Sequence, residues 1–379
     1  MQSKLWREDN MSKNTLQKPK KPLNLGQYAF ILIFAALFVF YYLRADGLTV
    51  TAITNILRHA AIPGMLGFGM ALIIITGDID LSVGAIMCCV ASFGCVFANF
   101  LLEKGVSTGL GVLLIVLFCL AGGTLLGFLN GFLIGKAKLP AFIVTLATQL
   151  IFRSVAKYSA TDKVTTQLLR GEAANTYAMN RAGEGERMRE VMYNFGQMRL
   201  FDGSLKLPVL GLIFIAVGIL LIYVTTSTKY GKRLYAIGSN AKAAHMAGIN
   251  VERTRVSVFT VTGLLCGMAA AMWLCDKAKV DPATAGVNNE MYAIAAVVLG
   301  GISMSGGKGK LIGVIFGALS YTLIDKIIVA LEIKSTLIND SIKGLILLVA
   351  IVIQILGPKL KPAVTALLKK FKKEPVKAE

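Results

Sequence analysis

The sequence has few charged residues, few histidines and no cysteine pair suited to a metal. Only 16% of its 379 residues are Asp, Glu, Lys or Arg, whereas 55% are hydrophobic. A soluble globular protein carries about 25% charged residues, so the composition excludes that class. The two histidines and six cysteines form no C-x-x-C pair and no His partner at zinc-ligand spacing. We therefore expect a polytopic membrane protein with no metal site, in which the cysteines serve as small apolar packing residues.

The chain also lacks the usual signs of an enzyme. We find no nucleophile with a neighbouring base and no cofactor motif. The Gly-rich run from 301 to 310 does not fit a phosphate-binding P-loop, which needs Gly, four residues and then Gly-Lys-Ser/Thr. The residue five before Gly307 is Ile302, and Lys308 is followed by Gly309. We expect no catalytic residue and no bound cofactor in this chain.

Long apolar runs are what the sequence has in excess. Most of them are long enough to cross a bilayer as helices. The first follows a leader too long for a secretory signal, so we expect it to remain as an uncleaved span. The predicted fold class is all-α, a transmembrane domain over residues 25–356 with about ten helices and with re-entrant or broken segments. The predicted spans are 25–43, 53–75, 83–102, 109–134, 139–157, 207–226, 256–275, 291–303, 310–331 and 337–356.

The net charge of +19 is concentrated in alternate connections between the predicted spans. Lys and Arg gather in cytoplasmic loops of membrane proteins, so their distribution sets the orientation. It predicts cytoplasmic basic tails at 1–24 and 357–379, a cytoplasmic loop at 227–255 and an extracytoplasmic loop at 158–206. The basic excess therefore indicates orientation, and we expect no nucleic-acid partner.

A short polar sequence occurs twice, at 77–84 and at 300–307. Each copy stands between two apolar runs, and the two align in register. Glycines let the backbone bend there, and Asp80 or Ser82 can cap the helix that follows. Two interpretations stay open, a capping turn at the membrane surface and a break that lines a transport pathway. The pathway candidates in these two segments are Gly77, Asp78, Asp80, Ser82, Gly84, Gly300, Gly301, Ser303, Ser305 and Gly307.

Two loops are long enough to carry function. The outer loop 158–206 contains a mixed-charge stretch, 186–193, that is able to form a short helix, and the loop is either a docking surface for a soluble partner or a solvated insertion. The inner loop 227–255 contains an Ala-rich stretch that Asn240 can cap and Gly248 can end, which predicts a short helix. A rigid helical knob of this kind suits a groove on a partner protein.

Taken together, these segments resemble the permease subunits of bacterial ABC importers, in the branch that serves ribose, galactose and related sugars. The G-x-I-D-L-S-x-G box of that family matches 77–84. Three departures are Asp78 where a second Gly is common, Tyr292 where an Asp is common, and Lys242 where an acidic residue often stands. The residues that match its coupling loop are Gly238, Asn240, Ala243, Ala244 and Gly248, and those that match further motifs and join the pathway candidates are Asn130, Thr145 and Glu290.

The resemblance implies an ATP-driven, binding-protein-dependent importer in the bacterial cytoplasmic membrane, carrying a monosaccharide of the galactose or ribose type by alternating access. It implies four partners, which are a cytoplasmic ABC ATPase on loop 227–255, an extracytoplasmic sugar-binding protein, a second permease subunit and the lipid bilayer. Two alternatives stay open. One keeps the importer and changes the cargo to nucleosides or another small polar solute. The other is an ion-coupled secondary transporter in which Asp78 and Asp80 are the coupling acids.

The orientation is testable by labelling a single cysteine placed at Ser204 in a background that lacks the native cysteines. Because 158–206 is expected outside, an impermeant maleimide should label this cysteine in intact cells. Labelling that requires the membrane to be opened from the cytoplasmic side would contradict the predicted topology.

Overall fold

The computed structural model describes residues 29–44, 49–161, 177–178, 184–200 and 206–332, with a few further residues between 338 and 352. Both predicted tails, 1–24 and 357–379, and most of the predicted last span lie outside the described residues.

The predicted all-α class is confirmed, since the only strands in the described part are two short antiparallel pairs, β1 with β4 and β2 with β3. The elements are α2 (Ala29–Arg44), α3 (Val50–Ile75), α4 (Val83–Glu103), α5 (Thr108–Gly135), α6 (Ala141–Thr161), β1 (Tyr177–Ala178), α8 (Glu184–Gln197), β2 (Arg199–Leu200), β3 (Leu207–Pro208), α9 (Val209–Ser227), α10 (Lys229–Ser239), α11 (Ala241–Met246), α12 (Val251–Lys277), β4 (Lys279–Val280), α13 (Asn289–Leu299) and α14 (Ile312–Ala330).

Six of the described helices, α3, α4, α5, α9, α12 and α14, are long and apolar enough to cross a membrane. Helices α2 and α13 are apolar but shorter, with 16 and 11 residues. Helix α6 has 21 residues but is less apolar and carries Arg153 and Lys157. The helices begin and end close to the predicted spans. The polytopic membrane class is confirmed, whereas the count of ten spans stays a prediction.

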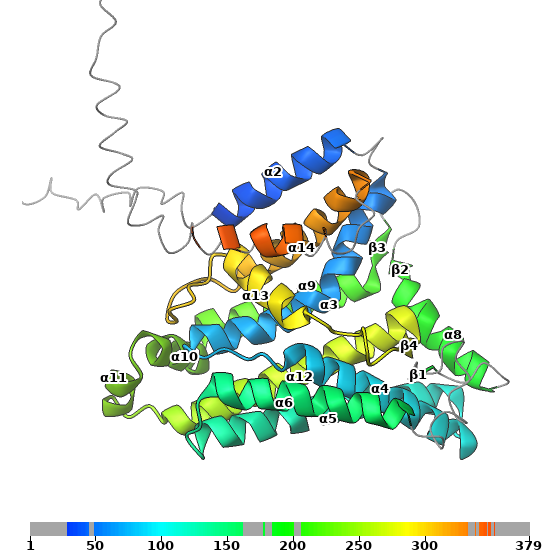
Figure 1. Ribbon diagram of the computed structural model, residues 1–379, viewed down its shortest axis with the longest axis horizontal. Coiled ribbons are helices and arrows are strands. Elements are labelled where there is room, and N and C mark those ends of the chain that lie inside the picture. Colours follow the sequence, from blue (N-terminus) through cyan, green and yellow to red (C-terminus); the bar gives the residue numbers. More distant parts are fainter. Residues whose placement is uncertain are drawn as a thin grey trace, which may run out of the picture.

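The helices run between two ends of the molecule that differ in structure (Figure 1). At one end, on the left of the figure, lie the short helices α10 and α11. The opposite end carries α8 and all four short strands. Loop 227–255 and the described part of loop 158–206 therefore lie at opposite ends, as the predicted topology requires.

Helix α3 lies at the centre of the packing. It contacts α9, α12, α13 and α14, and its residues from Gly64 to Thr76 are all buried. A helix that is apolar on every side is stable only when other helices surround it. By contrast, α5 and α9 leave large apolar side chains exposed along their length, as expected for helices that face lipid. Examples are Leu113, Leu117, Phe128, Ile219 and Leu220.

Helices α5 and α12 approach each other through glycines. A Cβ atom at Gly123 or Gly127 would overlap the backbone of α12 near Gly263, and a Cβ at Gly263 would overlap the backbone of α5. Small residues at every fourth position let two helix backbones come into direct contact, which is how helices associate tightly in lipid. The glycines on the facing sides of α5 and α12 therefore serve close packing.

Helix α8 gives the outer segment a packed structure. Its Met188 and Met192 are fully buried, and the helix contacts α5 and α12. After it, Arg199 donates hydrogen bonds to Thr54 Oγ1 (3.1 Å) and Asn55 Oδ1 (2.7 Å) at the start of α3. The predicted short helix is confirmed. Helix α8 packs against α5 and α12 and is therefore not a solvated insertion. Docking of a partner on loop 158–206 stays a prediction.

The α5–α12 contact predicts different results for two glycines of α5, one inside the contact and one outside it. Gly127→Ala places a methyl group against the Phe259 carbonyl and should cost about 1–3 kcal/mol of stability. Gly122→Ala places its methyl group 3.6 Å from Val90, an ordinary contact, and should leave stability unchanged or slightly higher because Ala favours helix. Thermal unfolding in detergent, followed by size-exclusion chromatography, measures both. Equal melting temperatures for the two variants would contradict close glycine packing.

Candidate functional site

The first polar break, 76–82, connects the end of α3 to the start of α4. Gly77 has a φ of +88°, a left-handed conformation that glycine adopts without strain. The carboxylate of Asp78 forms an ion pair with Arg255 of α12, with 3.0 Å between Oδ2 and Nε. The break is therefore held both by its own turn and by the first part of α12.

Asp80 and Ser82 lie inside the protein, 1% and 0% exposed, whereas Gly77 is exposed, so the rest of the chain covers part of this segment and its depth in the membrane stays a prediction. The expected side-chain cap is wrong for Ser82, whereas Asp80 Oδ1 accepts a hydrogen bond from the Ser82 amide (2.7 Å) at the N-cap position of α4. Ser82 occupies the N-cap position of α4 but makes no capping hydrogen bond, because its Oγ donates to Asp80 Oδ1 (2.6 Å) and accepts from Asn130 Nδ2 (2.8 Å). Thr145 lies nearby, its Oγ1 3.5 Å from the Ile79 carbonyl oxygen. Four predicted residues thus form one buried polar cluster.

The start of α4 meets the segment that precedes α13. Gly84 lies so close to Gly286 and Glu290 that a Cβ on it would come within 2.5 Å of the Gly286 carbonyl oxygen. Glu290 is buried and accepts a hydrogen bond from Gln149 of α6 (3.0 Å). On the same helix, Arg153 donates to the carbonyls of Pro282 (3.3 Å) and Ala285 (3.0 Å). Helix α6 therefore holds the 282–290 segment against α4.

The second polar break, 300–311, is a compact turn between α13 and α14. The backbone of Ser303 makes two hydrogen bonds within the turn: its carbonyl accepts from the Gly306 amide, and its amide donates to the Lys308 carbonyl. The Ser303 Oγ also accepts a hydrogen bond from the Ser305 amide. Gly300 packs against the backbone of Gly313 at the start of α14. The side chain of Ser305 is exposed, as is Gly301, so these two predicted pathway residues do not join the buried cluster.

The two breaks and the inner loop meet at one point, which we call the junction and define by Ile75, Gly238 and Gly307. The Gly307 amide donates to the Ile75 carbonyl at the end of α3 (2.9 Å). Gly238, near the end of α10, fills the space beside this bond, since a Cβ there would overlap the Ile75 carbonyl. Tyr235, one turn earlier, donates its hydroxyl to the Gly309 carbonyl (3.0 Å). Burial raises the pKa of the Tyr235 phenol above its usual value, which keeps this donor protonated.

Helix α11 projects beyond the junction as the predicted knob (Figure 1). Asn240 caps it by accepting from the Ala243 amide (3.0 Å), and Gly248 turns the chain with a φ of +82°. Ala244 matches the coupling loop of the resembled family, and an outward, partner-facing position expected for it on that ground is wrong. Its side chain is 5% exposed because it faces its own chain, whereas Ala243 is exposed and Met246 is 88% exposed. The outward face of the knob is therefore formed around Met246.

Sequence reasoning found both breaks and the knob but not the residues that join them. Gly238 was expected in the coupling loop, yet its contact with Ile75 and Gly307 has no local sequence signal. Tyr235 and Arg255 were also missed, although polar residues next to predicted breaks give a weak signal for such contacts.

Comparisons with known proteins agree with this arrangement. Residues 52–353 match the family described as branched-chain amino acid transport system / permease component. A fructose import permease protein from Rhizobium meliloti is 35% identical over 70% of this chain and 67% of its own. A ribose import permease protein from Bacillus subtilis is 33% identical over 86% of this chain and 91% of its own. A xylose transport system permease protein from Haemophilus influenzae is 30% identical over 87% of this chain and 96% of its own. No solved structure was found to match.

The family match covers most of the chain, including every described helix from α3 to α14 apart from the first two residues of α3. The relatives named above are permeases that import sugars, and they align over more than two thirds of this sequence. The chain therefore belongs to this permease family and is a multi-pass membrane permease of the ABC sugar importer type.

Proposed function

We propose that this chain forms the membrane pathway of an ATP-driven importer for a monosaccharide of the galactose or ribose type. An extracytoplasmic binding protein delivers the sugar, a cytoplasmic ATPase supplies the energy, and a second copy of the permease completes the pathway. The observation that carries the proposal is the junction, because Gly238 connects the exposed α11 directly to both polar breaks. A force on α11 acts there on the ends of α3 and α13, and alternating access requires such a connection.

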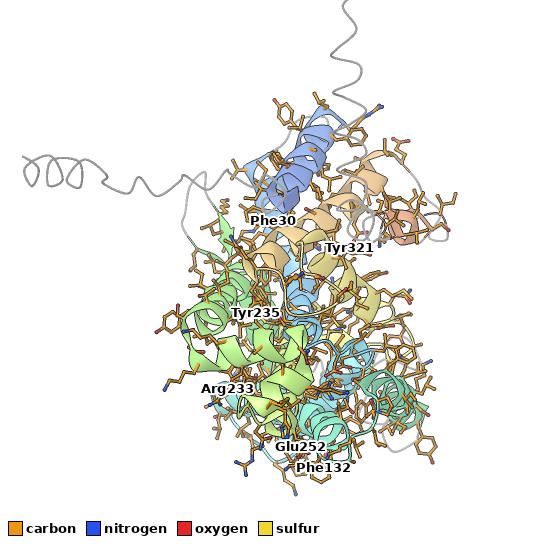
Figure 2. All side chains as sticks on the ribbon, turned by 90° about the vertical axis from the view of Figure 1, so that its left-hand side faces the viewer. Phe30, Phe132, Arg233, Tyr235, Glu252 and Tyr321 are labelled. Atoms are coloured by element: carbon orange, nitrogen blue, oxygen red, sulfur yellow. The ribbon has the colours of Figure 1, made fainter. Side chains whose placement is uncertain are left out.

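The charge at the two ends supports the proposed orientation, with both termini in the cytoplasm. The end that carries α10 and α11 faces the viewer in Figure 2, where Arg233 is labelled, and it is rich in basic residues. Among its cations Lys136 and Lys138 share Glu252 as their ion-pair partner. Basic loops stay on the cytoplasmic side. The basic residues of this end are Lys136, Lys138, Lys229, Lys232, Arg233, Lys242, Arg253, Lys308 and Lys310.

An ion-coupled secondary transporter is the less favoured function. A coupling acid must be able to bind and release its ion, and here Asp78 is paired with Arg255 while Asp80 accepts two hydrogen bonds from Ser82. The named relatives that import sugars also favour a sugar over a nucleoside as the cargo.

The role of the junction is tested by Gly238→Ala. The added methyl group overlaps the Ile75 carbonyl and should separate α10 from the Ile75–Gly307 hydrogen bond. We expect uptake into vesicles that contain the ATPase and the binding protein to fall at least about tenfold, equivalent to about 1.4 kcal/mol. Gly109→Ala is the matched control, because a Cβ there has no neighbour within 4 Å. Full uptake by Gly238→Ala would rule out the junction as the transmitting contact.

The partner surface is tested by adding the same charge at two ends of the molecule. Met246→Glu should weaken binding of the ATPase subunit at least about tenfold without lowering the melting temperature, because the side chain is outside the protein's own core. Met198→Glu, 48% exposed at the opposite end, should leave that binding unchanged. Ala244→Glu should instead lower the melting temperature, because it introduces a carboxylate at a buried position. Pull-down of the ATPase and thermal unfolding measure these effects. Equal binding by both Met variants would remove α11 as the ATPase site.

A further inference from the structure

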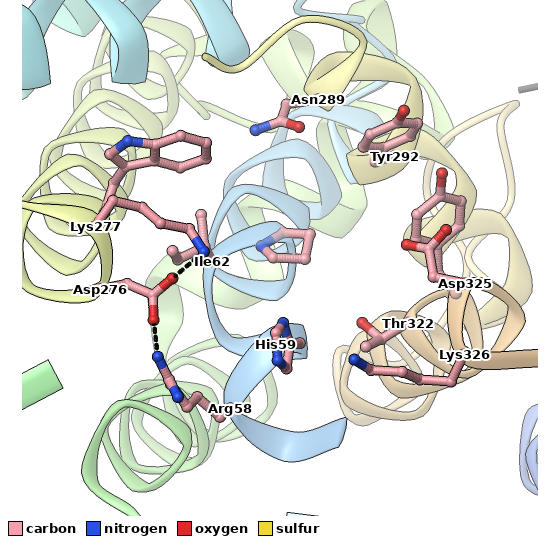
Figure 3. A pocket seen from close by; sticks show the side chains of 13 residues that line it. Arg58, His59, Ile62, Asp276, Lys277, Asn289, Tyr292, Thr322, Asp325 and Lys326 are labelled. Carbon is pink, nitrogen blue, oxygen red and sulfur yellow. Dashed lines mark hydrogen bonds and ion pairs between the residues drawn. The ribbon is translucent and has the colours of Figure 1, made fainter. Parts of the chain in front are cut away.

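A cavity of about 210 Å³ opens in the half of the molecule away from the junction (Figure 3). It lies between the first half of α3, the end of α12, the start of α13 and the second half of α14. His59, Ile62, Asn289 and Thr322 line it together with charged and aromatic side chains. The polar breaks lie elsewhere, so the cavity is distinct from the site described above.

All but one of the charged groups of the cavity are paired. Asp276 forms ion pairs with both Arg58 and Lys277, and these three side chains form one wall (Figure 3). On the other side, Asp325 forms an ion pair with Lys343 (2.6 Å). Within the described part of the chain, Lys326 has neither a carboxylate nor a hydrogen-bond partner, and its amine points into the cavity (Figure 3). Its three N–H donors are therefore available to a ligand.

Aromatic side chains form much of the remaining lining. The rings of Tyr292 and Tyr321 pack with centroids 4.8 Å apart, and the Lys343 amine lies over both rings, which fixes them in place. Trp273 donates its indole N–H to the Lys279 carbonyl (3.1 Å), which fixes the orientation of that ring. Rigid aromatic surfaces beside a few placed polar groups are typical of small-molecule sites.

We propose that this cavity binds a single monosaccharide within the permease, so that the permease itself selects its cargo. The proposal rests on the proposed function. The volume lies below the roughly 300–1,000 Å³ of sites for drug-sized ligands and suits a molecule with one ring. Lys326 and Asn289 supply donors to sugar oxygens, and the aromatic rings supply surfaces for the apolar C–H face of the sugar. A site in a pathway must bind weakly enough to release its ligand.

The chain carries its own reporter for this cavity. It has two tryptophans, Trp6 and Trp273, so Trp6→Phe leaves Trp273 as the single fluorophore. We would titrate this full-length variant in lipid nanodiscs with ribose, xylose, fructose and galactose as probes. At least one sugar should change the emission of Trp273 saturably, with a Kd on the order of 1 mM. In that background, Lys326→Met and Tyr292→Leu should each raise the Kd at least about tenfold.

Lys157→Met is the matched control, because Lys157 is exposed on α6 and does not line the cavity, and it should leave the Kd unchanged. No saturable change at roughly 100 mM of any probe would overturn the proposal without reference to any variant. An unchanged Kd in a folded Lys326→Met variant, or a response to phosphate alone, would also overturn it. Sugar uptake by the unmodified permease separates the failure of the cavity site from the failure of the proposed import function. Import without a Trp273 response removes only the cavity site, whereas no import of any probe by the assembled transporter removes the proposed function.

Discussion

The functional part of the structure depends on one hydrogen bond, between the Gly307 amide and the Ile75 carbonyl. This bond joins the end of α3 to the turn after α13, two segments more than 200 residues apart in the sequence. A helix end leaves its last carbonyls without partners, so the α3 terminus needs a donor from elsewhere. That donor comes from the second break, and only a glycine at 238 allows α10 to pack against the pair. Because the last carbonyl of α3 receives its hydrogen bond from the second break, and α10 packs against this bond, loop 227–255 lies against both breaks.

The glycine contact between α5 and α12 serves a different purpose. There the two backbones touch over several turns, through Gly123 and Gly127 on one helix and Gly263 and Gly267 on the other. Direct backbone contact leaves little room for the helices to slide or rotate. By contrast, the junction consists of a few contacts at helix ends, where small φ and ψ changes are absorbed easily. Of these two contacts, the one between α5 and α12 is therefore the more rigid.

Much of this architecture could be predicted from the sequence because hydrophobic runs and turn residues are local signals. The described helices begin and end close to the predicted spans, and the α11 knob has the predicted Asn240 cap and Gly248 turn. The wrong predictions concern the direction in which side chains point and the contacts between residues that are distant in the sequence. Ala244 faces inward and Ser82 bonds to Asp80 and Asn130, because tertiary packing decides which way a side chain points. Likewise, the cavity proposed to bind a monosaccharide combines residues from four helices, so no single stretch of sequence indicates it.

Helix α13 links the cavity to the second break. Its first turn carries Asn289 and Tyr292, which line the cavity, and Glu290, which lies against Gly84 at the start of α4. Its last residue, Leu299, leads directly into the second break. Eleven helical residues span only about 16 Å, and a helix of that length moves as a rigid body. A ligand that shifts Tyr292 therefore acts through α13 on the same break that α11 reaches through Gly238. The cavity at one end of the permease and α11 at the other therefore both reach the second break, which is the arrangement that reciprocal control between two distant sites requires.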